Sequence, residues 1–345
     1  FVATSEEEAN KLANEYYGKK VELKQDEDVL DTWFSSALWT FSTLDWPNKT
    51  YELDRFYPGN VLVTGFDIIF FWVARMMMMG SYFMKETPFK DVYIHPLIRD
   101  EKGQKMSKSK GNIIDPLVLL DKYGADTLRF TLTALLNPGR DVKLAEDRVK
   151  GYKSFTNKIW NAANFLEVNK CNYDAGFDTS LIKTPINQWI IKELKLINSE
   201  ISKNMDKYLF HEVSNTIYHF VWHTFCDWYI ELAKISLKKE NEESQETKNV
   251  LIWVFVEILK ITHPIMPFIT EKLWSMITNQ NKDFLMNQNF TNYKILREEN
   301  FNSSHEKIIL LNKIITSIRN LRSELNIPYK KLINISLEAK NEELN

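Results

Sequence analysis

The sequence predicts an α/β region followed by an all-α region that ends in a helix bundle. Short β-rich runs occur at residues 61–63, 92–94 and 97–99, and a long helical stretch at 68–84 separates the first two. This order of strand, helix and strand is typical of a parallel sheet covered by helices. Beyond about residue 116 the strand signals stop, and apolar residues recur at spacings of three and four, which is the helical period.

Composition limits the possible classes of protein. A chain of 345 residues corresponds to about two domains. Lys and Arg total 44 against 46 Asp and Glu, a net charge of −2, which excludes a polybasic binder but not a local basic patch. The two cysteines cannot form a disulfide framework, so we expect a reducing, cytoplasmic setting.

We expect no membrane-spanning segment and no secretory signal. The two most apolar stretches, at residues 61–84 and 251–269, are interrupted by charged residues and by glycine or proline. A span needs about 20 clean apolar residues, which neither stretch supplies. The sequence therefore predicts a soluble protein that does not bind membranes.

Helix start and stop residues define the individual elements. Ser5 and Glu8 form a capping box for a helix that should end near Gly18, while Asp115 and Pro116 begin the first helix of the all-α region. That helix continues over 117–123, and the further predicted helices are 125–136, 146–168, 186–205, 208–237, 250–277 and 308–325. A strand is expected to start at residues 333–337.

The segment with the most chemical information is residues 102–112, KGQKMSKSKGN. It holds four lysines and two serines, so ammonium groups and hydroxyl donors can converge on one multiply charged anion such as a phosphate. A solvated basic loop, or a general RNA-contacting patch, would have the same composition. Charge alone does not separate these alternatives.

The order of the residues in this segment distinguishes a phosphate-binding loop from a solvated or RNA-contacting basic loop. The run KMSKS at residues 105–109 is identical to the signature loop of class I aminoacyl-tRNA synthetases. The runs at 28–38, 64–75, 92–95, 139–142 and 151–163 all resemble the valyl-tRNA synthetase family. The resemblance implies the second half of a Rossmann-like catalytic domain over residues 1–140. A helical anticodon-binding domain would follow over 141–331, and a C-terminal extension would start at 332–345.

The resemblance assigns ATP binding to residues 102–112, which we call the lysine loop. Lys105 and Lys108 would neutralise the charge that grows on the departing pyrophosphate, and Lys108 would be the principal ATP contact. Met106, Ser107 and Ser109 complete the ATP-binding set that the resemblance implies. The two serines would hold the loop and donate to phosphate oxygens.

Three further residues would contact the adenylate. Gly65 follows a strand and lets a nucleotide approach the backbone, Asp67 would bind the ribose hydroxyls, and His95 would line the nucleotide site. Asp67 also fits a capping box with Thr64, and both roles are compatible. Pro96 departs from the family pattern, because proline removes one backbone donor.

The amino-acid side chain would be held by Trp33, Ile68 and Trp72, whose family positions wall the pocket. Rigid aromatic walls exclude water and limit the volume around a small branched side chain. In a chain with 10 tryptophans, the alternative is that these two simply fill the core.

The implied activity has two steps. Valine and ATP, with Mg²⁺ as part of the ATP substrate, give valyl-adenylate, and the valyl group passes to the 3′ end of tRNA(Val). We expect a monomer without a tightly bound cofactor or a metal site. The family's His-x-Gly-His motif and editing domain are absent from these 345 residues, so the sequence predicts a C-terminal portion that is inactive alone. An isoleucyl or leucyl enzyme and a non-catalytic tRNA-binding module are the alternatives.

Two other clusters have a functional and a structural interpretation. His219, His223 and Cys226, followed by Asp227, have spacings that could hold zinc, but the surrounding aromatic residues favour a helix core. Basic residues at two places could contact RNA or form solvated helix faces. These are Arg148, Lys150, Lys153 and Lys158, which alternate with Tyr152, Phe155 and Trp160, and then Arg319, Arg322, Lys330 and Lys331.

Overall fold

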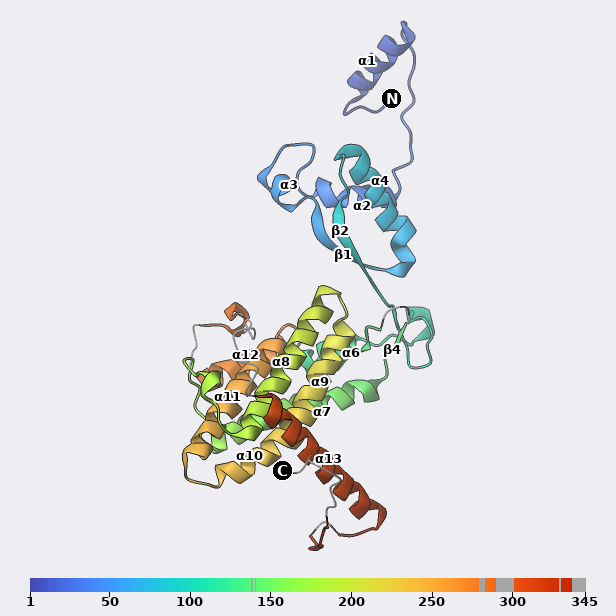
Figure 1. Ribbon diagram of the computed structural model, residues 1–345. Coiled ribbons are helices and arrows are strands. Elements are labelled where there is room, and N and C mark those ends of the chain that lie inside the picture. Colours follow the sequence, from blue (N-terminus) through green and yellow to red (C-terminus); the bar gives the residue numbers. More distant parts are fainter. Residues whose placement is uncertain (138, 140, 279–282, 290–300, 329, 337–345) are drawn as a thin grey trace. The chain divides into compact units, whose positions relative to one another are not determined.

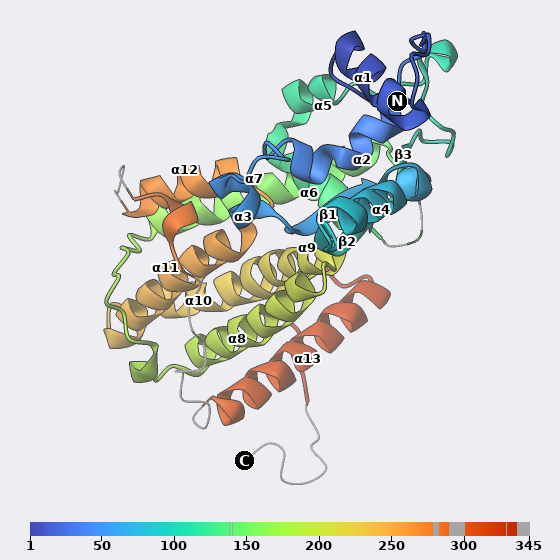
Figure 2. The same cartoon turned by 90° about the horizontal axis from the view of Figure 1, so that it is seen from above.

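The computed structural model describes residues 1–137, 139, 141–278, 283–289, 301–328 and 330–336, without the side chain of Lys108. The chain forms two compact units, residues 1–95 and 96–345, and each is described by itself. Figures 1 and 2 show the first unit with its small sheet and the second as a set of long helices. The predicted order of an α/β region and an all-α region is confirmed. The predicted domain boundary after residue 140 lies inside the second unit.

The first unit is built on a two-stranded parallel sheet. Strands β1 (Gly59–Gly65) and β2 (Phe89–His95) pair from Gly59↔Phe89 to Gly65↔His95, which confirms the predicted strand–helix–strand unit. The crossover is not one helix, as predicted for residues 68–84, but three consecutive pieces. They are the 3₁₀ turn η1 (Phe66–Ile68), the π-helix η2 (Ile69–Val73) and α4 (Ala74–Phe83).

Three more helices belong to this unit, namely α1 (Glu6–Tyr17), α2 (Thr32–Ser42) and α3 (Tyr51–Phe56). Ser5 caps α1 by accepting from the Glu8 amide, and Gly18, with φ +64°, ends the helix. The return half of the predicted capping box is different, because the Glu8 carboxylate accepts from Thr4 instead. Helix α2 packs on α4 beside the sheet.

Residues 66–83 are apolar over a length that could cross a membrane, and 17% of this window is buried within the described structure. The window contains Asp67 and Arg75, and it changes helix type twice. A core helix of a soluble protein has the same length and composition, but such a helix is mostly buried, and this window is not. The absence of a membrane-spanning segment therefore stays a prediction.

The second unit begins with a parallel bridge of two short strands, β3 (Ile98–Arg99) and β4 (Val142–Lys143). Its longer helices are α5 (Pro116–Tyr123), α6 (Ala125–Leu135), α7 (Glu146–Val168), α8 (Pro185–Asp206), α9 (Phe210–His219), α10 (Ile230–Leu237), α11 (Glu242–Thr262), α12 (Pro267–Thr278) and α13 (Asn302–Glu324). Short 3₁₀ turns are η3 (Lys108–Lys110), η4 (Thr179–Leu181) and η6 (Leu285–Asn287). Asp115 caps α5 by accepting from the Leu117 amide, as predicted.

The helices after residue 145 share one hydrophobic core. Helix α8 packs between α9 and α13, while α11 contacts α8, α10 and α12 (Figures 1 and 2). Fully buried side chains such as Trp189, Phe225 and Phe255 fill this core. The packing buries the apolar stripe of each helix, which is the arrangement that the helical spacing predicts.

The structure corrects three predicted elements of this region. The stretch predicted at 208–237 is continuous from Phe210 to Leu237, but its middle is a ten-residue π-helix, η5 (Phe220–Tyr229). The predicted helix 250–277 is broken between α11 and α12 by a turn that contains Pro264, because proline cannot continue the backbone hydrogen-bond ladder. Residues 333–336 contain no strand, and Leu337, like the rest of the predicted extension from 337 onward, lies outside the described residues.

A carboxylate links the start of α11 to the start of α8. Glu246 accepts hydrogen bonds from the amides of Lys183 and Thr184, both at 3.0 Å, and from the Asn187 side chain at 2.9 Å. Burial by itself would raise the pKa of Glu246, but these donors together lower the pKa below the ordinary value for glutamate. The charged form is therefore part of the folded bundle.

We predict that Glu246→Gln lowers the free energy of unfolding by about 1–2 kcal/mol at about pH 7, since the amide loses the charge and turns an N–H group toward an N–H donor. The lowered pKa means that this stabilisation is present above the ordinary glutamate pKa of about 4.3 and is lost as the pH falls through the folded value. Thermal unfolding at several pH values should show the two proteins converging in acid. Glu242→Gln, on the exposed first turn of the same helix, is the control and should change little.

Candidate functional site

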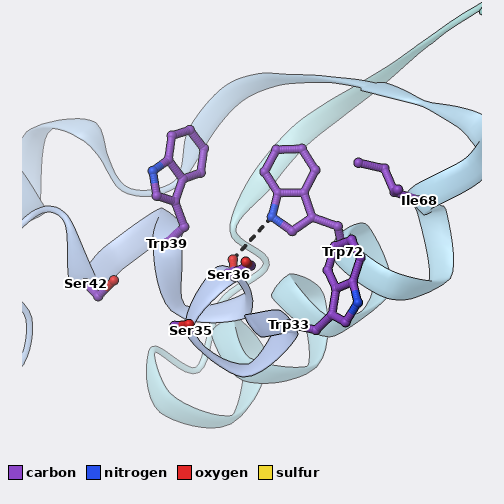
Figure 3. A pocket seen from close by; sticks show the side chains of 7 residues that line it. All are labelled: Trp33, Ser35, Ser36, Trp39, Ser42, Ile68 and Trp72. Atoms are coloured by element: carbon purple, nitrogen blue, oxygen red, sulfur yellow. Dashed lines mark hydrogen bonds between the residues drawn. The ribbon is translucent and has the colours of Figure 1, made fainter. Parts of the chain in front are cut away.

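An open pocket of about 490 Å³ lies between α2 and the start of the crossover in the first unit. Trp33, Ile68 and Trp72, the three residues expected around an amino-acid side chain, all line it (Figure 3). The remaining lining residues are Ser35, Ser36, Trp39 and Ser42. The lining is uncharged and largely aromatic, so the pocket suits a small apolar group.

Local structure explains why these side chains meet. Asp31 caps α2 by accepting from the Trp33 amide at 2.6 Å, which sets Trp33 in the first turn of the helix. Ile68 and Trp72 lie four residues apart across the junction with the π-helix, close to one turn of that wider helix. The Trp72 indole donates from Nε1 to the Ser36 carbonyl at 3.2 Å, as Figure 3 shows, and so ties the crossover to α2.

The predicted nucleotide residues of this unit lie at the carboxyl edge of the sheet. Gly65 and His95 are Cα partners in the last pair of the β1–β2 ladder. Asp67 is exposed two residues after Gly65. The alternative capping role is not found, because η1 has no side-chain cap hydrogen bond and the buried Thr64 hydroxyl donates to the Gly65 carbonyl at 3.2 Å.

The lysine loop belongs to the second unit, where Asn112 holds its two ends together. The Asn112 side chain accepts from the Ser107 amide at 3.0 Å and donates to Asp100 at 2.9 Å and to the Lys105 carbonyl at 3.3 Å. Asp100 also accepts from the Gln104 amide at 2.6 Å. The hydrogen bonds from Asn112 and from Gln104 hold the pKa of the Asp100 carboxyl below its usual range.

This hydrogen-bonded loop carries positive charge and hydroxyl groups. Lys105 is exposed and has no acidic partner among the residues that the structure describes. The hydroxyl groups of Ser107 and Ser109 lie 3.2 Å apart. Met106 is half-buried in the same loop, and the Lys108 side chain lies outside what the structure describes.

Lys143 is a further cation beside the loop. The β3–β4 bridge pairs it with Arg99, and its side chain packs on Gly103, where an added Cβ would meet Lys143 Cε at 3.0 Å. Gly103 also has φ +80°, a backbone conformation that favours glycine, whereas the flexible Lys143 side chain could move away from an added Cβ. Arg99 is neutralised by an ion pair with Asp141.

The possible zinc cluster is divided between the surface and the core, although His223 Nδ1 lies 3.3 Å from Asp227 Oδ2. Cys226 lies in the core, where burial raises its pKa to about 12, whereas His219 and His223 are exposed and stack with ring centres 5.5 Å apart. No group of three or more metal-ligating side chains was found within the described ranges.

Most of the basic residues that could contact RNA have exposed or half-exposed side chains. In the first set, however, Phe155 is fully buried and cannot stack on a base. Lys158 pairs with Asp227 at 2.8 Å and lies over the Trp222 ring. In the second set, Arg319 lies over the Trp228 ring, and Arg322 donates to backbone carbonyls that follow α13.

Sequence reasoning missed several residues of these sites, among them Trp39, Asn112 and Lys143. Trp39 could have been found from helical spacing, since Ser35, Trp39 and Ser42 share one face of α2. Asn112 directly follows Gly111 at the end of the loop, which is a weak turn signal. Nothing local marks Lys143, because a parallel bridge to a segment more than 40 residues earlier brings it to the loop.

Comparison with known families gives two matches. Residues 2–145 match the family described as tRNA synthetases class I (I, L, M and V), and residues 187–337 match the anticodon-binding domain of tRNA ligase. The chain is 50% identical over 342 residues to the valine–tRNA ligase of Pelagibacter ubique, covering 98% of this chain and 39% of that protein. It is also 50% identical to the valine–tRNA ligase of Bartonella quintana, covering 96% of this chain and 37% of that protein. The chain thus spans less than half the length of these relatives.

Solved structures show the same fold. A leucyl-tRNA synthetase of Agrobacterium radiobacter, solved as a ternary complex with tRNA, superimposes with a TM-score of 0.64 at 17% identity, over 80% of this chain and 35% of that one. A methionyl-tRNA synthetase of Mycobacterium tuberculosis, in complex with methionyl-adenylate, gives 0.58 at 18% identity, over 79% of this chain and 57% of that one.

We predict that Asn112→Ala loosens the lysine loop. Loss of three hydrogen bonds should lower the local free energy of opening by about 1–3 kcal/mol, so the Ser107 amide should exchange with solvent about tenfold faster or more. Hydrogen–deuterium exchange measures this rate. Lys110→Ala changes a side chain of the same loop that makes no hydrogen bond or ion pair with the described residues, and it should leave the rate unchanged. Equal protection in Asn112→Ala and wild type would contradict the role of Asn112.

Proposed function

The chain belongs to the class I tRNA synthetases of the I, L, M and V group, and from this membership we propose that its protein is a valine–tRNA ligase. Valine and ATP would form valyl-adenylate and pyrophosphate, and the valyl group would then pass to the 3′ end of tRNA(Val). The observation that carries the proposal is the convergence of Trp33, Ile68 and Trp72 on one uncharged pocket. We further propose a cytoplasmic monomer.

The pocket chemistry supports a small branched aliphatic substrate. The lining consists of three tryptophans, one isoleucine and three serines, so it offers no charge to pair with an acidic or basic side chain. Rigid aromatic groups also limit the volume, because they lose little conformational freedom and do not yield easily to a larger guest. Valine fits this description, and isoleucine differs from it by one methylene group.

The residues at the sheet edge would hold the adenylate. Gly65 and His95 are paired across the ladder, so a nucleotide that approaches the Gly65 backbone would also meet the His95 strand end. Asp67, exposed directly after this point, would accept hydrogen bonds from the ribose hydroxyls. Its carboxylate is suited to this because each oxygen can accept from a separate hydroxyl group.

The lysine loop would act on the pyrophosphate. In adenylation a carboxylate attacks an anionic α-phosphate, so positive charge near the leaving group lowers the barrier. Lys105 and Lys108 would supply this charge, with Ser107 and Ser109 as hydroxyl donors and Mg²⁺ entering with ATP as substrate. The Asp100–Asn112 pair would keep the loop backbone in place while its side chains follow the departing group.

The helical part of the second unit would bind tRNA(Val). The family match over residues 187–337 supports this assignment. Exposed Arg148 and Lys150 on α7 offer phosphate contacts, and Trp160, 37% exposed on the same helix, offers a surface on which a base can stack.

Amino-acid-dependent exchange of pyrophosphate into ATP tests the proposal directly on the full-length protein. Exchange that depends on valine would support it. Exchange that depends on isoleucine or leucine would replace valine by that substrate, and no exchange with any of the three would favour a tRNA-binding module.

We predict that Lys108→Ala in the full-length protein slows adenylation with a loss of about 2–4 kcal/mol of transition-state stabilisation, since a fixed cation near the developing charge is removed. Pre-steady-state pyrophosphate release at saturating valine and ATP measures the step. Lys110→Ala, which removes the same charge two residues later, is the matched control and should retain most of the rate. Equal effects of the two substitutions would attribute the loss to general charge rather than to Lys108.

We also predict that the 345-residue chain alone binds tRNA but releases no pyrophosphate from ATP and valine. Because binding would rely on phosphate contacts, its affinity should fall steeply as salt is raised. Gel shifts with tRNA(Val) and a pyrophosphate-release assay measure the two properties. Adenylate formation by this chain would contradict the expectation that it is inactive alone.

A further inference from the structure

Trp39 is the one aromatic residue of the pocket that the proposed function leaves without a role. It projects from α2 into the same pocket as Trp33 and Trp72 (Figure 3). Its ring centre lies 6.0 Å from that of Trp72, with the two planes inclined at 42°. The two indoles are therefore direct neighbours in the pocket wall.

Trp39 is one of the contacts that set the orientation of Trp72. In the described structure the Trp72 indole donates from Nε1 to the Ser36 carbonyl, and the side chain packs against the buried cluster of Leu62, Val73, Met76 and Phe89. The neighbours on its pocket side then decide how far the ring can move there. Figure 3 shows Trp39 and Ile68 on opposite sides of the Trp72 indole, so Trp39 lies where the ring would go if it moved away from Ile68.

Trp39 is poorly explained as a core residue. Its side chain is 51% exposed, whereas the structural tryptophans Trp189 and Trp274 are only 2% and 1% exposed. Its exposure, its place in the lining and its contact with the Trp72 ring put Trp39 in the wall of the pocket rather than in a core.

We propose that Trp39 is a positioning residue that holds the Trp72 indole toward Ile68 and so sets the width of the space for the amino-acid side chain. This inference rests on the proposed function, because it takes the pocket as the valine site. Without Trp39 the indole gains room to move, the pocket widens, and a side chain one methylene larger than valine fits with less repulsion. Trp39 thus determines specificity without touching the reacting atoms.

The test uses Trp39→Leu and Trp39→Phe in the full-length protein, with valine- and isoleucine-dependent pyrophosphate exchange as the readout. For Trp39→Leu we expect KM for valine to rise about two- to tenfold, the worth of one aromatic pair. The turnover number at saturating valine and KM for ATP should change less, since the wall contacts ground state and transition state alike. The preference for valine over isoleucine in kcat/KM should fall. Trp39→Phe, which restores an aromatic neighbour, should recover most of both properties.

Phe34→Leu provides the matched control, because Phe34 lies on the same helix with 36% exposure and does not line the pocket. It should leave KM and the preference unchanged. Wild-type values for Trp39→Leu, or a fall in the turnover number without a change in KM or preference, would overturn the inference. If valine supports exchange in the wild type, this failure leaves the proposed function standing; absence of valine-dependent exchange in the wild type would overturn the proposed function itself.

Discussion

Parallel strand pairing is the constraint on which the candidate sites depend. Two parallel strands cannot be joined by a tight turn, so a long crossover must separate them in sequence. In the first unit this crossover supplies Ile68 and Trp72, and the ladder itself sets Gly65 beside His95. In the second unit the short β3–β4 pairing also brings distant segments together, because it places Lys143 beside Gly103 of the lysine loop. In both units, candidate binding residues lie at or next to the ends of parallel strands, which is where open α/β folds bind ligands.

The two sites are held by different kinds of contact, suited to different tasks. The pocket is bounded by stiff aromatic rings, and a hydrogen bond between Trp72 and a backbone carbonyl joins its two walls. Such a site can select by shape. The lysine loop has a polar frame, in which Asn112 and Asp100 fix the backbone while the Lys105 side chain stays exposed. Mobile cations on a fixed backbone suit a charge that moves during a reaction.

The helices of the second unit are joined in part by carboxylates that accept from the start of another helix. Glu246 receives the amides before α8, and Asp126 on α6 receives those of Phe268 and Ile269 in the first turn of α12, at 3.2 and 2.6 Å. These bonds satisfy amide groups that a helix start leaves without internal partners, and they place negative charge at the positive end of the helix dipole. Arg129 completes the second junction by donating to the carbonyls of Pro264 and Ile265. The break between α11 and α12 is thereby held by α6.

The sequence by itself determined the order of elements, the caps at Ser5 and Asp115 and the identity of the lysine loop, because each depends on residues within one or two helical turns. It also brought Trp33, Ile68 and Trp72 together, through resemblance rather than through spacing. Only the tertiary structure decided that Trp39 shares their pocket, that Asn112 closes the loop, that Lys143 joins it and that Phe155 is buried. The physical reason is that a helix or a helix cap depends on residues that are neighbours in the sequence. Burial, and contact across a pair of parallel strands, depend on segments that are distant in the sequence and meet only when the chain folds.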